Sequence, residues 1–208
     1  VVRDIVDAVR FAVAQGPVDA RQVFLVGASG GGHASLLMAG RHPRLWAGVS
    51  AWVPIFDLRD WHGQKRYMAD MEKSCGGAPG DSIEVDEQYR VRSPSNWLKQ
   101  GDHPPLHINA GIHDGHKGSV PVSHALLAFN AVASPRDRLT PEEISHFVER
   151  RAVPPHLARP VEDPSYGDRK PLFRRRSCTA EVTIFEGAHE IVEEAAMAWF
   201  QSLLAPKN

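Results

Sequence analysis

The sequence predicts an α/β domain with a mainly parallel sheet that is flanked by helices. Helix-like and strand-like segments alternate along the chain, which is the pattern typical of this class. The strand-like segments are short, continuous apolar runs, as expected for parallel strands buried on both faces. The length of 208 residues suits one domain with a substantial core, so we expect residues 1–208 to form a single domain.

The first half of the chain begins with an amphipathic helix. Apolar residues recur at helical spacing over residues 1–15, and Gly16-Pro17 is a strong stop signal. The elements expected after it are a short strand at Val23–Val26, a helix at Ala34–Arg41 that ends before His42-Pro43, and a second buried strand at Trp46–Ile55.

Residues 57–104 differ in kind from the segments before them. They carry aromatic side chains among charges, with glycines and prolines around the stretch CGGAPGD at 75–81. We expect an insert of short helices that lies as a lid over one edge of the sheet. The candidates for lining a substrate pocket are Trp61, Tyr67, Tyr89 and Trp97, and the alternative for each is packing in the core.

The second half continues the alternation of strands and helices. A third strand is expected at Leu106–Ala110 and is followed by a helix at Val120–Val132. The chain closes with a fourth strand at Glu181–Phe185 and a helix at Ile191–Leu204.

Between these elements, residues 134–176 are rich in proline and arginine. One helix is expected there, at Pro141–Arg151, because Thr140 is a good N-cap and a first-turn proline follows it. We expect the run Arg174–Arg176 to be a solvated entry to the fourth strand.

Composition excludes several classes of partner. The formal net charge of −1 gives no overall field that would favour nucleic acid or an anionic membrane. The longest apolar run, Leu45–Phe56, is shorter than the roughly 20 residues of a membrane-spanning helix. Cys75 and Cys178 could form one disulfide or remain two thiols, which leaves the compartment open, an extracytoplasmic one included.

A glycine-rich turn follows the first strand and contains one serine. Gly27-Ala28-Ser29-Gly30-Gly31 matches G-x-S-x-G, the nucleophile elbow that holds a serine on a sharp bend between a strand and a helix. Small neighbours are needed because bulky ones would clash at such a bend. The backbone N–H of Gly30 would point to the position where an oxyanion forms, at the positive end of the helix dipole.

Two other interpretations of these glycines remain open. A phosphate-binding turn of a short-chain dehydrogenase has similar glycines, and Tyr166 and Lys170 form the Tyr-x-x-x-Lys string of that family. Chemistry would need both side chains on one helix, which Pro164, Gly167 and Pro171 disfavour. The glycines could also serve only to let a strand and a helix pack closely.

A serine hydrolase of this type needs an acid and then a histidine later in the chain. Asp114 follows the third strand and His189 follows the fourth, at the ends where active sites of open α/β sheets assemble. We expect Ser29 to attack the acyl carbon and His189 to accept and later return its proton. Asp114 would orient the imidazole and stabilise its charged form.

Several residues compete for these roles. Asp57 follows the second strand and is the alternative triad acid. His33 lies on the elbow helix, where packing or a polar contact is the simpler explanation. His113 and His116 have the spacing of a weak metal motif, but no third ligand accompanies them, so no metal is expected.

Three stretches, GASGGGH, GIHDGHKGSVPVSH and FEGAHE, together resemble the catalytic domain of prolyl oligopeptidase-like serine hydrolases of the α/β-hydrolase superfamily. The resemblance covers nearly the whole chain. The family's glycine, acid and later Val-Pro are matched by Gly111, Asp114 and Val120-Pro121, with a slightly longer gap. It implies the triad Ser29, Asp114 and His189, with the Gly30 amide as one oxyanion donor.

The chain also departs from the full α/β-hydrolase fold, because it accounts only for the last strands. The strand at Val23–Val26 would then be an edge strand with unpaired backbone groups. A second oxyanion donor, from a loop after an earlier strand, would be absent. Since Val1 already lies in a helical pattern, we expect these residues to be the C-terminal part of a larger hydrolase that needs its N-terminal part.

The sequence therefore predicts a serine hydrolase that cleaves an ester or a peptide bond through an acyl-enzyme. A non-catalytic binding domain of the same fold is the alternative, and an NAD(P)-dependent short-chain dehydrogenase is a third reading. No cofactor is expected for the hydrolase. Its expected partner is a small ester or peptide substrate.

Overall fold

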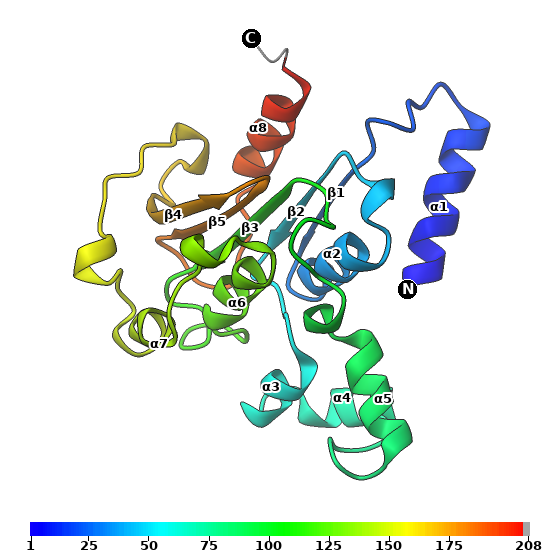
Figure 1. Cartoon of the computed structure of the whole chain (residues 1–208), viewed down its shortest axis with the longest axis horizontal. Coiled ribbons are helices and arrows are strands. Elements are labelled where there is room, and N and C mark those ends of the chain that lie inside the picture. Colours follow the sequence, from blue (N-terminus) through cyan, green and yellow to red (C-terminus); the bar gives the residue numbers. More distant parts are fainter. Residues whose placement is uncertain (206–208) are drawn as a thin grey trace.

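The computed structural model describes residues 1–205 and contains a five-stranded sheet of order β1-β2-β3-β5-β4 (Figure 1). The strands are β1 Phe24–Ala28, β2 Gly48–Trp52, β3 Leu106–Gly111, β4 Pro171–Ser177 and β5 Ala180–Phe185. The pairs β1–β2, β2–β3 and β3–β5 are parallel, and β4 pairs antiparallel with β5. Within the described residues β1 lies at the sheet edge, as predicted.

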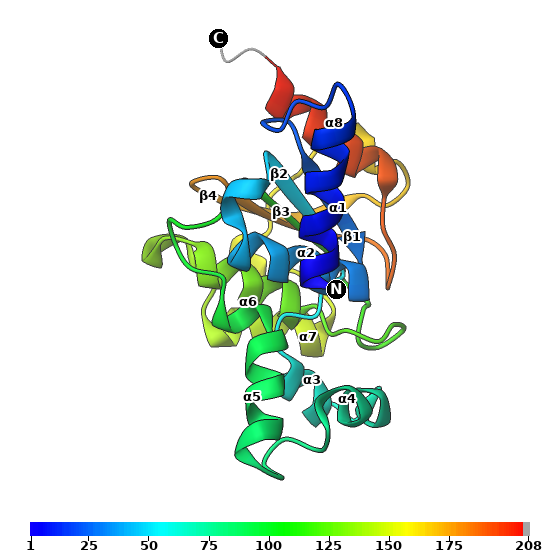
Figure 2. The same ribbon diagram turned by 90° about the vertical axis from the view of Figure 1, so that its right-hand side faces the viewer.

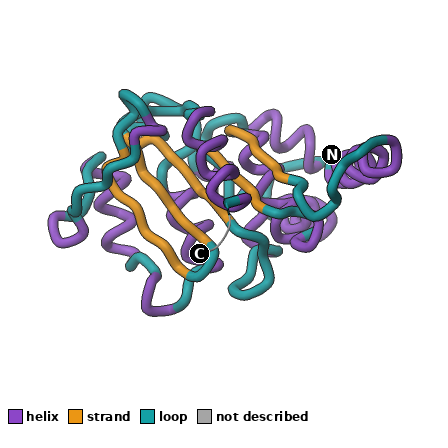
Figure 3. The backbone as a smooth tube through the Cα atoms, turned by 90° about the horizontal axis from the view of Figure 1, so that it is seen from above, coloured by secondary structure: helices purple, strands orange, loops and turns teal. Residues whose placement is uncertain are grey.

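Helices cover both faces of this sheet, which confirms the predicted fold class. In Figure 1, α2 and α6 lie on one side of the strands and α8 on the other. Figure 3 shows the sheet from above, with helices in front of and behind its strands. The helices are α1 Val2–Gln15, α2 Gly30–Arg41, α3 Leu58–Gly63, α4 Met68–Cys75, α5 Ile83–Arg92, α6 Ser123–Val132, α7 Pro141–Arg150 and α8 Glu193–Leu204.

The segment between β2 and β3 forms short helices, as predicted. Helices α3, α4 and α5 extend away from the sheet in both side views (Figures 1 and 2). They share a small core of their own, built from Met71, Cys75, Val85 and Tyr89. Tyr89 is therefore a core residue, with its hydroxyl donating to the carbonyl of Gly77 (3.3 Å).

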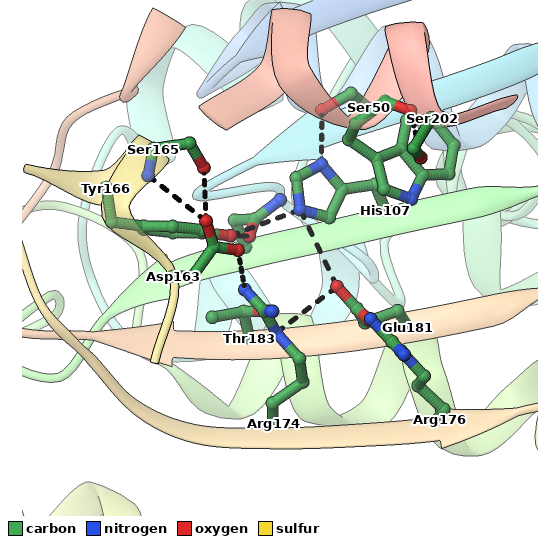
Figure 4. Close-up of polar contacts among 12 residues, drawn as sticks. Ser50, His107, Asp163, Ser165, Tyr166, Arg174, Arg176, Glu181, Thr183 and Ser202 are labelled. Carbon is green, nitrogen blue, oxygen red and sulfur yellow. Dashed lines mark hydrogen bonds and ion pairs between the residues drawn. The ribbon is translucent and has the colours of Figure 1, made fainter. Parts of the chain in front are cut away.

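The two faces of the sheet differ in chemistry. Alternation along β2, β3 and β5 turns apolar side chains toward α2 and α6. These residues are Val49, Ala51, Leu106, Ile108, Val182 and Ile184, all buried. The opposite face, under α8, carries a buried polar chain instead (Figure 4).

The direction of hydrogen bonds along this polar chain follows from its ends. Tyr166 O–H donates to Asn109 Oδ1 (2.5 Å), so the tyrosine oxygen accepts from His107 Nε2–H (3.1 Å). Nδ1 of the neutral His107 ring then accepts from Ser50 O–H (3.1 Å). The Ser50 oxygen accepts in turn from Trp52 Nε1–H (2.8 Å). These bonds satisfy the buried ring, hydroxyl and indole groups, as burial requires. The Asn109 Nδ2 group has no partner among the described residues.

The prediction for Arg174–Arg176 was wrong, because these residues lie within β4 and not in a solvated entry to a strand. Arg174 is compensated by Asp163 (2.7 Å) and Glu181 (3.3 Å), and Arg176 also contacts Glu181 (Figure 4). The arginines conceal the strand in the sequence, since the acids that neutralise them come from other segments.

Two further sequence questions are answered by the structure. Cys75 is buried and Cys178 is exposed, and both are free thiols, so the disulfide alternative is wrong. Among residues 1–205, no helix combines the length and the apolar character that crossing a bilayer would require.

Two buried histidines make stability depend on pH. Burial lowers the pKa of His107 to about 3 and that of His124 to about 4. His124 Nδ1 accepts from the Phe56 backbone N–H (3.1 Å), which needs an unprotonated nitrogen. In the unfolded chain both rings bind a proton near pH 6.5. Below that pH the unfolded state therefore takes up more protons than the folded state.

We expect the free energy of unfolding of the intact protein, measured in urea, to fall between pH 7 and pH 4.5. Each histidine contributes up to about 1.4 kcal/mol per pH unit. A His107→Gln variant should be less stable at pH 7 and should show a shallower dependence on pH. A pH dependence as steep as that of the wild type would contradict a neutral His107 in the folded state.

Candidate active site

The carboxyl ends of three parallel strands bring Ser29, Asp114 and His189 together. Ser29 follows β1, Asp114 follows β3 and His189 follows β5. His189 Nε2 lies 2.8 Å from Ser29 Oγ, and His189 Nδ1 lies 2.8 Å from Asp114 Oδ2. The three side chains thus form one continuous line of hydrogen bonds across the edge of the sheet.

Ser29 sits on a bend whose backbone is strained. Its φ of 56° and ψ of −119° are unusual for a non-glycine residue. The bend is fixed by the Ser29 N–H, which donates to the Trp52 carbonyl (2.9 Å). A Cβ on Gly27 would collide with the backbone of Gly31, so the motif needs a glycine at its first position.

Helix α2 begins at Gly30, four residues earlier than predicted. The first turn consists of Gly30, Gly31 and Gly32, whose low helix propensity hid it in the sequence. Gly32 lies so close to the Trp52 carbonyl that a Cβ there would clash. The glycines therefore let the helix start directly at the serine and pack tightly on β2.

Backbone amides hold the Asp114 carboxylate, which is buried. Its Oδ1 accepts from the N–H of Gly115 (2.9 Å) and from the N–H of Val120 (3.2 Å). These two bonds occupy one oxygen and direct the other, Oδ2, at His189. The loop from Gly115 to Val120 thus orients the acid.

The loop that carries His189 is fixed by a neighbouring acid. Glu190 Oε1 accepts from the Ala188 N–H (3.0 Å), and its Oε2 pairs with Arg169 (2.7 Å). The side chain of His189 is 23% exposed, so its ring borders solvent as well as Ser29. A base in this position can exchange its proton with a substrate that enters from outside.

An apolar cavity of about 300 Å³ opens beside Ser29. It is lined by Ser29, Gly30, His33, Ile55, Leu58, Trp61, Tyr67 and Ser119. A larger cavity of about 560 Å³ shares Gly30, His33 and the wall of segment 57–104 and continues between α1, α4 and α5. A substrate group bound in the smaller cavity would lie directly next to Ser29.

Of the four aromatic candidates, Tyr89 is a core residue, and the other three differ in whether they line the cavities. Trp61 and Tyr67 line both cavities, with their rings stacked at 5.3 Å between centroids. Trp97 lines neither cavity, and its ring centroid lies 4.8 Å from the guanidinium carbon of Arg41 and 5.9 Å from that of Arg90. Its Nε1–H donates to the carbonyl of Val91 (3.1 Å), which fixes it on α5.

The competing residues have other partners. Asp57 caps α3 by accepting from the N–H groups of Arg59 and Asp60, so it is not the acid at His189. His113 pairs with Glu186 (2.8 Å), and His116 contacts the Val148 carbonyl (2.7 Å). No group of three potential metal ligands occurs among residues 1–205.

His33 lies on the cavity wall and its ring is hydrogen-bonded to the Ile55 carbonyl (3.0 Å). Burial lowers the pKa of His33, which favours its neutral form. The neutral ring donates one hydrogen bond and adds no charge to the apolar wall. The sequence analysis expected packing or a polar contact for His33, and the structure shows the polar contact.

The dehydrogenase interpretation of the glycine turn lacks its second half. Tyr166 belongs to a single 3-10 turn, Pro164–Tyr166, and Gly167 follows it with a positive φ of 54°. The Tyr166 hydroxyl is buried in the polar chain under α8, on the sheet face described above. Tyr166 and Lys170 therefore do not share a helix.

Two residues at the site escaped the sequence analysis. Ser119 Oγ lies 3.4 Å from His189 Nε2, and the Ser119 carbonyl accepts from Trp61 Nε1–H (2.9 Å). Arg66 contacts the carbonyls of Gly118 and Gly115 in the same loop. These contacts join residues between 49 and 70 positions apart, and the sequence carries no periodic signal for them.

Comparison with known proteins identifies a family and a fold. Residues 1–142, more than half of the chain, match the prolyl oligopeptidase family of peptidases. No curated protein sequence gives a significant match.

Solved structures with the same fold are much longer. The chain aligns with Pyrococcus horikoshii acylaminoacyl peptidase at a TM-score of 0.61 and 15% identity, covering 100% of this chain and 28% of that one. It aligns with a Mycobacterium tuberculosis puromycin-hydrolyzing peptidase at a TM-score of 0.56 and 16% identity, covering 97% of this chain and 23% of that one. With oligopeptidase B from Leishmania major the TM-score is 0.55 and the identity 13%, and the alignment covers 97% of this chain and 22% of that one. The chain thus spans about a quarter of each solved protein.

Proposed function

The chain belongs to the prolyl oligopeptidase family, and from this premise we propose that it carries the catalytic residues of a serine peptidase. The observation that carries the proposal is the line of hydrogen bonds from Ser29 through His189 to Asp114. This geometry suits hydrolysis of a peptide bond through an acyl-enzyme.

In the first half of the reaction, Ser29 Oγ attacks the carbonyl carbon of the scissile bond. His189 Nε2 accepts the serine proton and passes it to the nitrogen of the leaving amine. Asp114 Oδ2 accepts from Nδ1–H throughout, which keeps Nε2 unprotonated before attack and stabilises the imidazolium afterwards. The bond between carbonyl carbon and nitrogen breaks, and an ester of Ser29 remains.

In the second half, water replaces the amine. His189 Nε2 takes a proton from water, the hydroxide attacks the ester, and the proton returns to Ser29 Oγ as the carboxylic acid leaves. Both halves pass through a tetrahedral oxyanion. The Gly30 N–H, at the first position of α2, has no partner within its helix and is the donor we assign to that oxyanion.

We assign the apolar cavity beside Ser29 to the acyl side of the substrate. Trp61, Tyr67 and Gly30 are among its lining residues. A bulky apolar side chain next to the scissile carbonyl would bury its surface there, at about 25 cal/mol per Å². Residues 57–104, which carry Trp61 and Tyr67, would then act as a specificity insert above the sheet edge.

Replacement of the three residues tests the mechanism. We expect Ser29→Ala and His189→Gln to lower kcat of the intact protein by about 10³-fold or more on a chromogenic peptide anilide. Ser145→Ala, on the exposed surface of α7, is the matched control and should keep wild-type activity. Equal rates for wild type and Ser29→Ala would favour a non-catalytic binding domain instead.

The acyl pocket is tested with two tryptophans. We expect Trp61→Ala to raise KM about tenfold for peptides with a bulky apolar residue before the scissile bond, a loss of roughly 1.4 kcal/mol of binding. Peptides with alanine at that position should be affected less. Trp97→Ala, outside the cavities, is the control. An equal effect of both variants on all peptides would remove Trp61 from the pocket.

A further inference from the structure

Side chains from segment 57–104 are hydrogen-bonded to the loop that follows Asp114. Trp61 Nε1–H donates to the Ser119 carbonyl (2.9 Å). The Arg66 guanidinium donates to the Gly118 carbonyl through one nitrogen and to the Gly115 carbonyl (3.4 Å) through the other. Three carbonyls of one short loop are thus bound by two side chains about fifty residues earlier in the sequence.

The other side of the same loop faces the acid and the base. The N–H groups of Gly115 and Val120 donate to Asp114 Oδ1. A Cβ on Gly118 would collide with Asp114 Oδ1 and with the Cβ of His189, so the backbone there lies directly against both residues. A shift of this loop would therefore move the carboxylate relative to the imidazole.

The turn that presents Arg66 is itself held in an unfavourable conformation. Lys65 and Tyr67, on either side of Arg66, have φ values of 59° and 54°. Non-glycine residues adopt this left-handed region only where the surroundings fix it, and such residues cluster at functional sites. The Tyr67 ring is fixed by its stacking on Trp61 (5.3 Å between centroids).

We propose that Arg66 is a positioning residue of the peptidase: it holds the loop 115–119 against Asp114 and so keeps Asp114 Oδ2 on His189 Nδ1. The inference rests on the proposed function, since it assigns Arg66 a role in that reaction. The contacts suit an arginine, because a guanidinium presents two separate nitrogens in a fixed fork to the two carbonyls, whereas an ammonium offers a single nitrogen on a flexible stem. Tyr67, the residue after Arg66, lines the acyl cavity, so Arg66 lies next to both the substrate pocket and the loop that holds Asp114.

The kinetic test uses p-nitrophenyl acetate, whose small acyl group does not fill the cavity. Arg66→Ala in the intact protein should lower kcat/KM about tenfold. Its acid limb in the pH–rate profile should shift to lower pH, because an imidazole with a weaker carboxylate partner binds its proton less tightly. The kcat/KM of Arg66→Lys should lie between those of wild type and Arg66→Ala. Lys65→Ala, which changes an exposed neighbour of Arg66, should match wild type.

A second measurement does not depend on activity. Lys117 is exposed in the loop, so endoproteinase Lys-C should cut after it faster in Arg66→Ala than in wild type or Lys65→Ala. Trp61→Phe removes the indole N–H that donates to the Ser119 carbonyl, and it should also make cleavage after Lys117 faster. This second variant keeps the test valid if Arg66→Ala folds poorly. Faster cleavage with unchanged rate and pH profile would overturn the positioning role, as would unchanged cleavage. If the wild type shows no turnover, the proposed function fails. The rate of Lys-C cleavage then still shows whether Arg66 holds the loop 115–119.

Discussion

The site depends on the two hydrogen bonds of the His189 imidazole, whose nitrogens lie 2.8 Å from Ser29 Oγ and 2.8 Å from Asp114 Oδ2. These partners lie 160 and 75 positions earlier in the chain. A parallel arrangement of β1, β3 and β5 brings their carboxyl ends to one edge of the sheet. The two differently packed faces keep those strands in register, apolar under α2 and α6 and hydrogen-bonded under α8.

The strained backbone of Ser29 is held in place by packing elsewhere in the domain. A residue with the backbone of Ser29 costs about 1–3 kcal/mol. Helix α2 offsets this cost through Leu36 and Met38, which are fully buried in the main core. Hydrogen bonds, not packing, hold Asp114. Two backbone N–H groups donate to its carboxylate, and Trp61 and Arg66 donate to carbonyls of the loop that follows it. Rigid packing therefore fixes the serine, and hydrogen bonds fix the acid.

Local signals predicted most of the fold and the approach of Ser29, Asp114 and His189. The glycine motif marked one strand end, and single polar residues after apolar runs marked two others. Strand β4 was missed because its arginines are neutralised by Asp163 and Glu181, which the sequence does not place beside them. Neither the position of Trp97 outside the two cavities nor the contacts of Arg66 could be predicted, because both depend on tertiary contacts that leave no periodic trace.

The central claim is that Ser29 forms a covalent acyl intermediate with His189 as its base. Its most direct test is a fluorophosphonate probe on the folded, intact protein, followed by mass mapping of the labelled peptide. The account predicts one adduct, on Ser29, which forms much more slowly when His189 is replaced by Gln. An adduct on a different residue, or no adduct with the fold intact, would contradict it.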